Sequence, residues 1–463
     1  MSVAPGAAAS GQGGEGQGGG GQGSEGQGSA RRPLRVGLAG LGTVGAGVVR
    51  LLRANADLIA ARAGRPISVV AVSARERRRE RGIEISDLRW HDDPADLAAD
   101  PSVDVVVELI GGAEGAARRV VEQALAAGRP VVTANKALLA VHGAALAARA
   151  DRHRTPLAFE AAVAGGIPVI KALREGLAAD RLTRVGGILN GTCNYILTAM
   201  RETGRPFDVI LAEAQALGYA EADPSTDIDG IDAAHKLAIL AALAFGRPVD
   251  FASVHVEGIR HITDQDIAFA AELGYRIKLL GIARLGADGV EARVHPCMVP
   301  TSAPIALVEG VFNAVFAEGD FVGRLMLEGR GAGAGPTASA VVADLIDIAR
   351  GTLIPVWGSE VGGLSQVSAV PISRHQGDYY LRLHVRDQPG VIAEIATVLR
   401  DCGVSLKSML QHGPAGERRD GESVPIVLVT HRTLEASMRE ALRLIARLDV
   451  VLLEPTMIRI EAA

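Results

Sequence analysis

Residues 36–45 read VGLAGLGTVG, and this stretch decides the fold of the N-terminal third of the chain. An apolar run passes directly into glycines spaced as GxGxxG, and a Val- and Ala-rich helical pattern follows. The first glycine permits a tight turn, the second lets a pyrophosphate approach the backbone, and the third lets helix and strand pack closely. The helix N-terminus then faces the phosphates. The pattern predicts a dinucleotide site formed by Gly40, Leu41, Gly42, Thr43, Val44 and Gly45.

Outward from this stretch, short Val-rich runs alternate with Ala-rich helical patterns as far as Pro156. We expect strands at residues 36–39, 69–72, 103–109 and 131–133, and helices at residues 44–61, 116–127 and 138–152. Continuous apolar strands between helices indicate a parallel sheet that is covered on both faces. Residues 34–156 are therefore predicted to form a Rossmann-type, doubly wound α/β nucleotide-binding domain.

The end of the second strand indicates which nucleotide is preferred. An NAD site usually presents an acidic residue to the adenosine ribose at this point. Here the strand runs into Ser73-Ala74-Arg75, and three more arginines follow at positions 77–79. Arg75 can pair with a 2′-phosphate through charge-assisted hydrogen bonds, although a solvated helix start would have the same composition. The sequence thus favours NADP over NAD.

Two later strand ends carry polar residues to the same edge of the sheet. Residues 108–112 read ELIGG, and residues 133–136 read TANK. Ligands of open α/β sheets bind beyond the carboxyl ends of the strands, so Gly111 is expected to border the nicotinamide. Lys136 is either a solvated helix start or a cation directed into the cleft, and its polar neighbours favour the second reading.

The densest polar cluster is at residues 218–236, GYAEADPSTDIDGIDAAHK, which lead into an apolar helix. Asp232 and Lys236 are four residues apart and share one helix face. Such a pair can be a weak surface salt bridge. A charged pair that enters an otherwise apolar helix is better placed in a cleft. Hydride transfer at a carbonyl carbon needs an acid or base for the oxygen, and Lys236 can serve while Asp232 holds its ammonium.

The rest of the chain divides into two predicted domains. Residues 157–350 mix helices with strands, such as 254–259 and 292–299, and are predicted to form an α+β catalytic and dimerisation domain. Residues 351–377 contain Gly-Ser and Val-Gly-Gly and are interpreted as a poorly structured linker. Residues 378–463 show the order βαββαβ, which is ferredoxin-like. Its strands are expected at 379–386, 404–410, 424–431 and 450–460, and its helices at 391–402 and 434–448.

Composition excludes several classes of function. A net charge of −5 over 463 residues gives no electrostatic footprint for nucleic acid or an anionic membrane. Three scattered cysteines do not make a disulfide framework or a zinc site, and no uncharged apolar run reaches 18 residues. Residues 1–33 are dominated by Gly, Gln and Ser, so a disordered tail without secretory features is expected. We therefore expect a cytoplasmic protein.

Six ordered stretches resemble the motifs of homoserine dehydrogenases, and together they span about residues 34–350. They are residues 40–45, 108–112, 134–136, 159–168, 188–192 and 216–236. The resemblance implies reversible NAD(P)(H)-dependent interconversion of L-aspartate 4-semialdehyde and L-homoserine, in threonine, methionine and isoleucine biosynthesis. A non-catalytic amino-acid sensor with a relic nucleotide domain is the alternative. A dehydrogenase of another substrate would leave the carboxylate-rich loop unexplained.

The resemblance also implies roles for individual residues. Lys236 falls on the family's proton-donor lysine, Asp232 on its companion, and Lys136 on the lysine between cofactor and substrate. Glu221 and Asp227 fall on carboxylates near the substrate, with Glu221 as the expected ligand of its amino group. The substrate loop corresponds to Asn190, Gly191 and Thr192.

Two glycine-rich segments complete the implied site. A late segment, within residues 331–350, returns to the nucleotide and matches the family at Gly333, Gly335 and Thr337. Residues 159–168 resemble a loop whose backbone carbonyls bind a monovalent cation, with Na⁺ expected. The implied ligands are Glu160, Val163, Gly165 and Ile167. By sequence chemistry alone, that loop is only a Gly-Gly turn.

The C-terminal residues 379–461 resemble an ACT domain, a module that binds amino acids in many biosynthetic enzymes. The resemblance rests on the βαββαβ order and on residues 387–392, DQPGVI. Gly390 would let a small effector approach a helix N-terminus, and threonine is the expected effector. A pairing module that binds no ligand is the alternative. A homodimer or homotetramer is expected.

Overall fold

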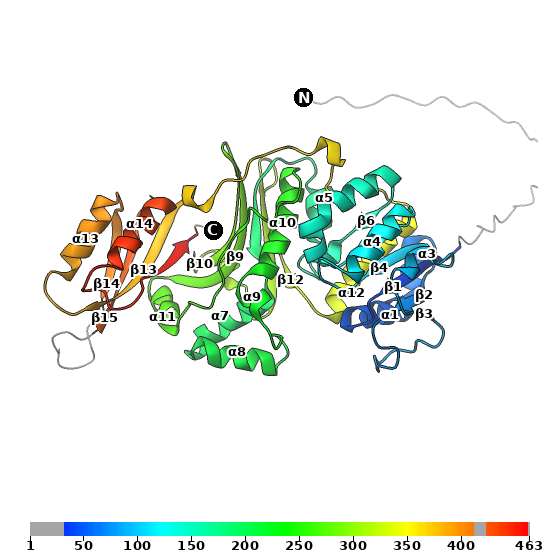
Figure 1. Cartoon of the computed structure of the whole chain (residues 1–463), viewed down its shortest axis with the longest axis horizontal. Coiled ribbons are helices and arrows are strands. Elements are labelled where there is room, and N and C mark those ends of the chain that lie inside the picture. Colours follow the sequence, from blue (N-terminus) through cyan, green and yellow to red (C-terminus); the bar gives the residue numbers. More distant parts are fainter. Residues whose placement is uncertain (1–31, 412–422, 462–463) are drawn as a thin grey trace, which may run out of the picture.

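The computed structural model describes residues 32–411 and 423–461, which form three modules in a row (Figure 1). The N-terminal module is at one end, the middle module carries the long strands β9 and β10, and the C-terminal module is at the other end. Nearly all of the predicted tail, residues 1–31, lies outside the described residues. Among the residues described, no helix has both the length and the apolar character needed to cross a bilayer.

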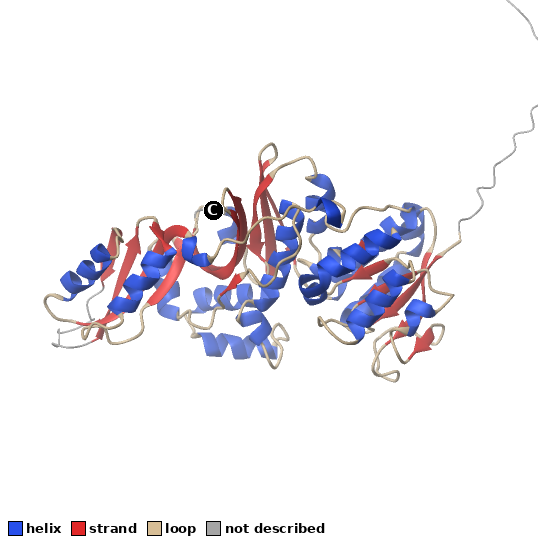
Figure 2. Cartoon of the chain, turned by 45° about the horizontal axis from the view of Figure 1, so that its top comes forward, coloured by secondary structure: helices blue, strands red, loops and turns tan. Residues whose placement is uncertain are grey.

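The N-terminal module is a six-stranded parallel sheet with the order β3-β2-β1-β4-β5-β6. Its helices lie on both sides of the sheet (Figure 2). The strands are β1 (Leu34–Ala39), β2 (Ile67–Ser73), β3 (Arg89–His91), β4 (Val105–Glu108), β5 (Val131–Thr133) and β6 (Leu157–Ala158). The strand order reverses between β1 and β4, which is where doubly wound folds bind their ligands. The predicted doubly wound fold is therefore confirmed.

Several predicted boundaries in this module were wrong. The single helix expected at 44–61 is two helices, α1 (Thr43–Ala54) and α2 (Ala56–Ala63), because Asn55 between them leaves the helical conformation. The short elements β3, β6 and α3 (Asp96–Ala99) were missed, since two to four residues carry no periodic pattern. Helices α4 (Ala116–Ala126) and α5 (Lys136–His153) lie where helices were expected.

The middle module is an antiparallel sheet crossed by the buried helix α10 (Ile231–Phe245). Its long strands are β7 (Leu182–Ile188), β9 (Tyr275–Gly286), β10 (Gly289–Pro300), β11 (Phe312–Gly319) and β12 (Gly323–Arg330). Its other helices are α6 (Val169–Lys171), α7 (Gly191–Thr203), α8 (Phe207–Ala216), α9 (Ser225–Ile228) and α11 (Asp264–Glu272). The strand expected at 254–259 is only β8 (His255–Val256), because the chain then turns to pack on residues 228–229.

Helix α12 (Ala334–Arg350) leaves the middle module and packs on α1 of the nucleotide-binding module. The two helices approach closely: a Cβ on Gly47 would lie 2.7 Å from the carbonyl oxygen of Ala334. The late segment of the chain thus lies beside the glycine-rich turn.

The C-terminal module has the strand order β17-β13-β15-β14, which confirms the ferredoxin-like prediction. Its strands are β13 (Gln376–Arg386), β14 (Leu406–Gln411), β15 (Ser423–Thr430), β16 (Thr433–Leu434) and β17 (Thr456–Ile460). Its helices are α13 (Val391–Asp401) and α14 (Glu435–Ile445). The strand expected at 450–460 is shorter, because residues 450–455 form only an isolated bridge before β17 begins.

The interpretation of residues 351–377 as a poorly structured linker was only partly right: up to residue 375 the segment has only two short 3-10 turns and one isolated bridge, but it is packed against the rest of the protein. Trp357 is 1% exposed, and the backbone of this segment bonds to Asp151, Gly246 and Val290 of the preceding modules. Its last two residues already belong to β13. Furthermore, β17 pairs in parallel with β10, so one eleven-stranded sheet runs through both the middle and C-terminal modules. We call residues 351–377 an anchored strap, because Trp357 is buried and the backbone is hydrogen-bonded to the preceding modules.

Candidate active site

A cleft of about 600 Å³ lies between the nucleotide-binding and middle modules. Twelve of the residues singled out from the sequence line it. They are Val44, Lys136, Gly165, Asn190, Gly191, Thr192, Glu221, Asp227, Asp232, Lys236, Gly333 and Thr337. The other twelve do not belong to this lining: Gly40, Leu41, Gly42, Thr43, Gly45, Arg75, Gly111, Glu160, Val163, Ile167, Gly335 and Gly390. Segments as far apart in the chain as Val44 and Thr337 thus meet at one site.

The glycine-rich turn has the shape that a dinucleotide requires. Gly40 has φ of +102°, and a Cβ there would lie 2.6 Å from the Leu109 carbonyl. A Cβ on Gly45 would lie 2.2 Å from the oxygen of Gly40, so helix and strand pack as predicted for the third glycine. A Cβ on Gly42 would meet nothing within 4 Å, which leaves its backbone open to a phosphate. The residues present therefore fit a bound dinucleotide.

A second helix N-terminus lines the same cleft. Gly333, with φ of +120°, precedes α12, and Thr337 lies in the first turn of that helix. Val44, in the first turn of α1, lines the cleft as well. Two helix N-termini place positive dipole ends at one place, which favours a phosphate-bearing ligand.

The arginine-rich segment after β2 is held against the glycine-rich turn by a residue that the sequence reasoning missed. Arg75 is exposed. Arg81 donates from Nε to the Leu41 carbonyl at 2.9 Å and from Nη1 to the Arg79 carbonyl at 2.6 Å. Arg77 and Arg81 also lie over the Trp90 ring, 5.8 and 5.9 Å from its centroid. No motif marks Arg81; its role depends on contacts that only folding creates.

On α10, Asp232 lies between two lysines. Its Oδ2 is 2.8 Å from Nζ of Lys236, and its Oδ1 is 3.1 Å from Nζ of Lys136. Lys236 Nζ also donates to the Leu189 carbonyl at 2.7 Å. Burial alone would raise the pKa of the Asp232 carboxyl, but the two lysines outweigh it and hold that pKa below its ordinary range. Asp232 is therefore an anion that fixes two ammonium groups.

Lys136 reaches this site because a side-chain hydrogen bond joins the ends of strands β4 and β5. Glu108 accepts the backbone N–H groups of Ile110 and Gly111 and the hydroxyl of Thr133. Asn135 then caps α5 and sets Lys136 at the first position of that helix. Asp232 raises the pKa of Lys136, although partial burial of the lysine acts in the opposite direction. The Lys136 side chain is 39% exposed, and the residue belongs to the lining of the cleft.

Asn190 connects the carboxylates of the cleft. Its Nδ2 donates to Asp227 Oδ1 at 2.8 Å and to Asp232 Oδ2 at 2.9 Å, while its Oδ1 caps α7. Thr192 donates its hydroxyl to the second oxygen of Asp227 at 3.1 Å. Glu221 lies exposed in the lining of the cleft. Together they present two carboxylates and a hydroxyl to a ligand.

The other two carboxylates of the cluster do not line the cleft. Asp223 accepts the backbone N–H of Ser225 at 3.1 Å, which stabilises the turn before α9. Asp229 pairs with Arg260 on the outside of the loop. Spacing alone did not separate these structural carboxylates from Glu221 and Asp227.

The predicted cation loop is a buried, sharply turned segment. Ala164 and Gly165 have φ of +54° and +45°, and a Cβ on Gly165 would lie 2.4 Å from the Gly331 oxygen. The carboxylate of Glu160 is held by the backbone N–H groups of Ile170 and Lys171, so only its carbonyl is left for the loop. The carbonyl of Ile167 accepts the N–H of Val169 at 2.7 Å. Neutral carbonyl oxygens in a buried turn suit a monovalent cation.

Asn313 is a cleft residue that the sequence reasoning missed. It is 1% exposed on β11, and both atoms of its amide lack a hydrogen-bond partner among the described residues. A Cβ on Gly331 would overlap its amide, and a Cβ on Gly191 would lie 3.3 Å from its Oδ1. It therefore sits between the substrate loop and the late glycine segment. A single Asn in a strand gives no signal in sequence.

Family models match most of the chain. Residues 40–160 match the homoserine dehydrogenase NAD binding domain, residues 168–346 match homoserine dehydrogenase, and residues 379–446 match the ACT domain. A homoserine dehydrogenase from Pseudomonas aeruginosa is 48% identical over 93% of this chain and 99% of its own length. One from Bacillus subtilis is 41% identical over 91% of this chain and 96% of its own.

Solved structures agree with these matches. A homoserine dehydrogenase from Thiobacillus denitrificans superposes with a TM-score of 0.88 at 47% identity, covering 93% of this chain and 99% of the other. A hyperthermophilic archaeal homoserine dehydrogenase in complex with NADPH has a TM-score of 0.59 at 27% identity. That pair covers 68% of this chain and 97% of the archaeal one.

Proposed function

This chain belongs to the homoserine dehydrogenase family, and on that premise we propose how its cleft works. The enzyme interconverts L-aspartate 4-semialdehyde and L-homoserine with a nicotinamide cofactor, which supplies or accepts the hydride. The observation that carries the proposal is one buried carboxylate, Asp232, between two lysines in a cleft that also contains two helix N-termini. Nothing in the comparisons supports the alternative of a non-catalytic sensor.

Lys236 donates a proton to the aldehyde oxygen during reduction and removes it during oxidation. Asp232 orients that ammonium, and Lys136 adds a second positive charge near the developing alkoxide. Glu221 and Asp227 bind the substrate ammonium. Asn190 keeps the oxygens of Asp227 and Asp232 in register, because it donates to both. The positions of these groups in the cleft support the proposed roles.

The direct test is a steady-state assay of the full chain with and without threonine. Oxidation of NADPH is expected only when aspartate semialdehyde is present, and threonine is expected to change the apparent substrate affinity roughly 5- to 150-fold, the range of typical coupling energies. No oxidation would reject the catalytic assignment. Oxidation that threonine leaves unchanged would reject only the effector.

We propose that NADP is preferred over NAD, with Arg75 as reader of the 2′-phosphate. Replacing Arg75 with alanine should weaken NADP binding about 10- to 100-fold, because a charge-assisted pair of hydrogen bonds contributes about 1.5–3 kcal/mol. NAD binding should change little. Titration of both nucleotides by fluorescence measures this, with Arg62→Ala as an exposed-arginine control. Equal losses for both nucleotides would show that Arg75 does not read the phosphate.

We further propose a monovalent cation, Na⁺, at the carbonyls of Glu160, Val163, Gly165 and Ile167. The supporting observation is the turned, buried backbone of residues 163–165, which abuts the late glycine segment at Gly331. A cation there would stiffen the contact between that segment and the cleft wall. It would take no part in proton or hydride transfer.

We propose that threonine binds the C-terminal module beside Gly390. A cavity of about 740 Å³ surrounds this residue, which has φ of +94° and precedes α13. Its lining includes Arg386, Gln388 and Gln411, which suit the carboxylate and hydroxyl of an amino acid. We also propose a homodimer or homotetramer, supported by the edge strand β12 and by Phe321, which is 90% exposed beside it.

A further inference from the structure

We propose that Glu257, held by Arg459 of the C-terminal module, is a positioning residue for Asp227, one of the two proposed substrate-binding carboxylates. Neither residue lines the cleft. The two residues belong to different modules, so through their ion pair the C-terminal module would influence the affinity of the cleft for substrate. The inference rests on the proposed substrate role of Asp227.

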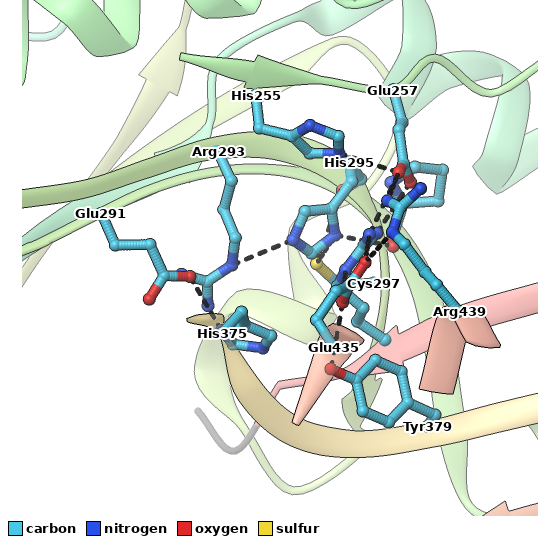
Figure 3. A network of polar contacts seen from close by, with 12 residues as sticks. His255, Glu257, Glu291, Arg293, His295, Cys297, His375, Tyr379, Glu435 and Arg439 are labelled. Carbon is cyan, nitrogen blue, oxygen red and sulfur yellow. Dashed lines mark hydrogen bonds and ion pairs between the residues drawn. The ribbon is translucent and has the colours of Figure 1, made fainter. Parts of the chain in front are cut away.

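Arg459 on β17 lies between one carboxylate from each module, Glu257 and Glu435; both of these carboxylates are labelled in Figure 3. Its Nη1 is 2.7 Å from Glu257 Oε2 and its Nη2 is 3.0 Å from Glu257 Oε1. Its Nε is 2.9 Å from Glu435 Oε2 on α14. The Arg459 side chain is 1% exposed and that of Glu435 is fully buried. A two-pronged, desolvated arginine fixes the relative position of the groups it joins.

Further donors hold the two carboxylates in this arrangement. Tyr379 donates its hydroxyl to Glu435 at 3.0 Å, and His255 and Arg439 lie 2.8 and 3.0 Å from Glu257. Burial alone would raise the pKa of Glu257, but its hydrogen bonds with His255 and Arg459 hold that pKa below its ordinary range. Glu257 is thus a fixed anion.

The chain directly after Glu257 contacts the carboxylate-rich loop. A Cβ on Gly258 would lie 2.2 Å from the Ile228 oxygen and 2.5 Å from Asp229 Cα, so no side chain fits there. The next residue, Ile259, donates its N–H to that same Ile228 oxygen at 2.8 Å. Ile228 is the immediate neighbour of Asp227. A shift of Glu257 therefore moves the backbone that carries Asp227.

A second ion pair across the same interface supplies the matched control. Asp266 on α11 pairs with Arg382 on β13, with Oδ1 2.7 Å from Nε and Oδ2 2.9 Å from Nη2. Both pairs are largely buried: Asp266 is fully buried where Glu257 is 27% exposed, and Arg382 is 8% exposed where Arg459 is 1% exposed. Asp266 bonds to Thr263 and to the C-terminal module, and the backbone beside it does not bond to the loop at 225–230. Both pairs therefore join an arginine of the C-terminal module to a carboxylate of the middle module. They differ in that only the Glu257 pair lies next to backbone that bonds to the carboxylate-rich loop.

The test compares Glu257→Gln, Arg459→Gln and Asp266→Asn in the full-length enzyme. Both variants of the first pair should raise KM for aspartate semialdehyde roughly 2- to 30-fold, the range for residues that modulate a site without contacting its ligand. Their kcat and their Kd for NADPH should stay within about twofold, since Lys236 and the nucleotide site are untouched. Asp266→Asn should lower the melting temperature at least as much and leave KM unchanged.

Four outcomes bear on the inference separately. A KM for Glu257→Gln equal to wild type, together with a lowered melting temperature, would overturn it and leave a purely structural ion pair. An equal rise of KM in Asp266→Asn would also overturn it, because lost stability would then be the cause. The variant Asp227→Asn is measured in parallel. An unchanged KM in Asp227→Asn would reject the substrate role of Asp227 itself. A raised KM in Asp227→Asn, together with an unchanged KM in Glu257→Gln, would reject only the positioning role of Glu257.

Discussion

Replacing Lys236 with alanine is expected to lower kcat by about two to four orders of magnitude, the usual contribution of a positioned general acid or base. The Lys236 ammonium is held at 2.8 Å by Asp232 and at 2.7 Å by the Leu189 carbonyl. Two other cations line the cleft: Lys136, which also contacts Asp232 but is far more exposed, and Arg330 on β12. Neither of them lies on α10, so neither takes the place of the Lys236 ammonium. The reduced rate is measured by NADPH oxidation at saturating substrate.

Two controls separate proton transfer from other causes. NADPH binding should be nearly intact, because the glycine-rich turn and α12 are separate elements from α10, which carries Lys236. Lys236→Arg keeps the positive charge but does not release a proton near neutral pH, so it should remain nearly as slow as the alanine variant. Recovery of activity with arginine would mean that the position supplies charge alone. An alanine variant that keeps more than about a tenth of wild-type kcat would reject Lys236 as the proton donor.

Deleting the C-terminal module from Asp378 onward is expected to destabilise the remaining chain severely. Tyr380, Val427 and Ile458 belong to the same hydrophobic core as the middle module, and each is at most 1% exposed. Their loss opens that core at a cost of about 1.5–3 kcal/mol per side chain. Deletion also removes β17 from the edge of β10, which leaves an open strand. Whole domains are stable by only about 5–15 kcal/mol, so little stability should remain.

Thermal unfolding and light scattering measure this expectation. The truncated chain should melt roughly 10 °C or more below the full chain, or aggregate during purification. Deleting residues 1–30 is the matched control, because a Gly- and Gln-rich segment has no apolar core to contribute. A soluble truncated enzyme with a wild-type melting temperature would show that the two modules do not depend on the shared core.

Much of the fold was predictable because local pattern and tertiary structure agree there. The VGLAGLGTVG stretch, the alternation of strands and helices, and the order βαββαβ each follow from side-chain periodicity and from glycine at sharp turns. The same local logic brought Asp232 and Lys236 to one helix face. Short elements such as β3 and β6 escaped, since they depend on pairing with neighbouring strands and not on their own composition.

The sequence by itself determined which residue types are available and which of them share a helix face or strand end. Only the tertiary structure decided that Lys136 contacts Oδ1 of Asp232, although the two residues are 96 positions apart in the chain. The fold likewise decided that Asp229 pairs with Arg260 outside the cleft. It also decided that residues 351–377 are an anchored strap and that Arg459 joins two modules. Contacts of this kind form when long-range packing buries groups together, whatever their separation in the sequence. For this reason no local sequence pattern predicts them.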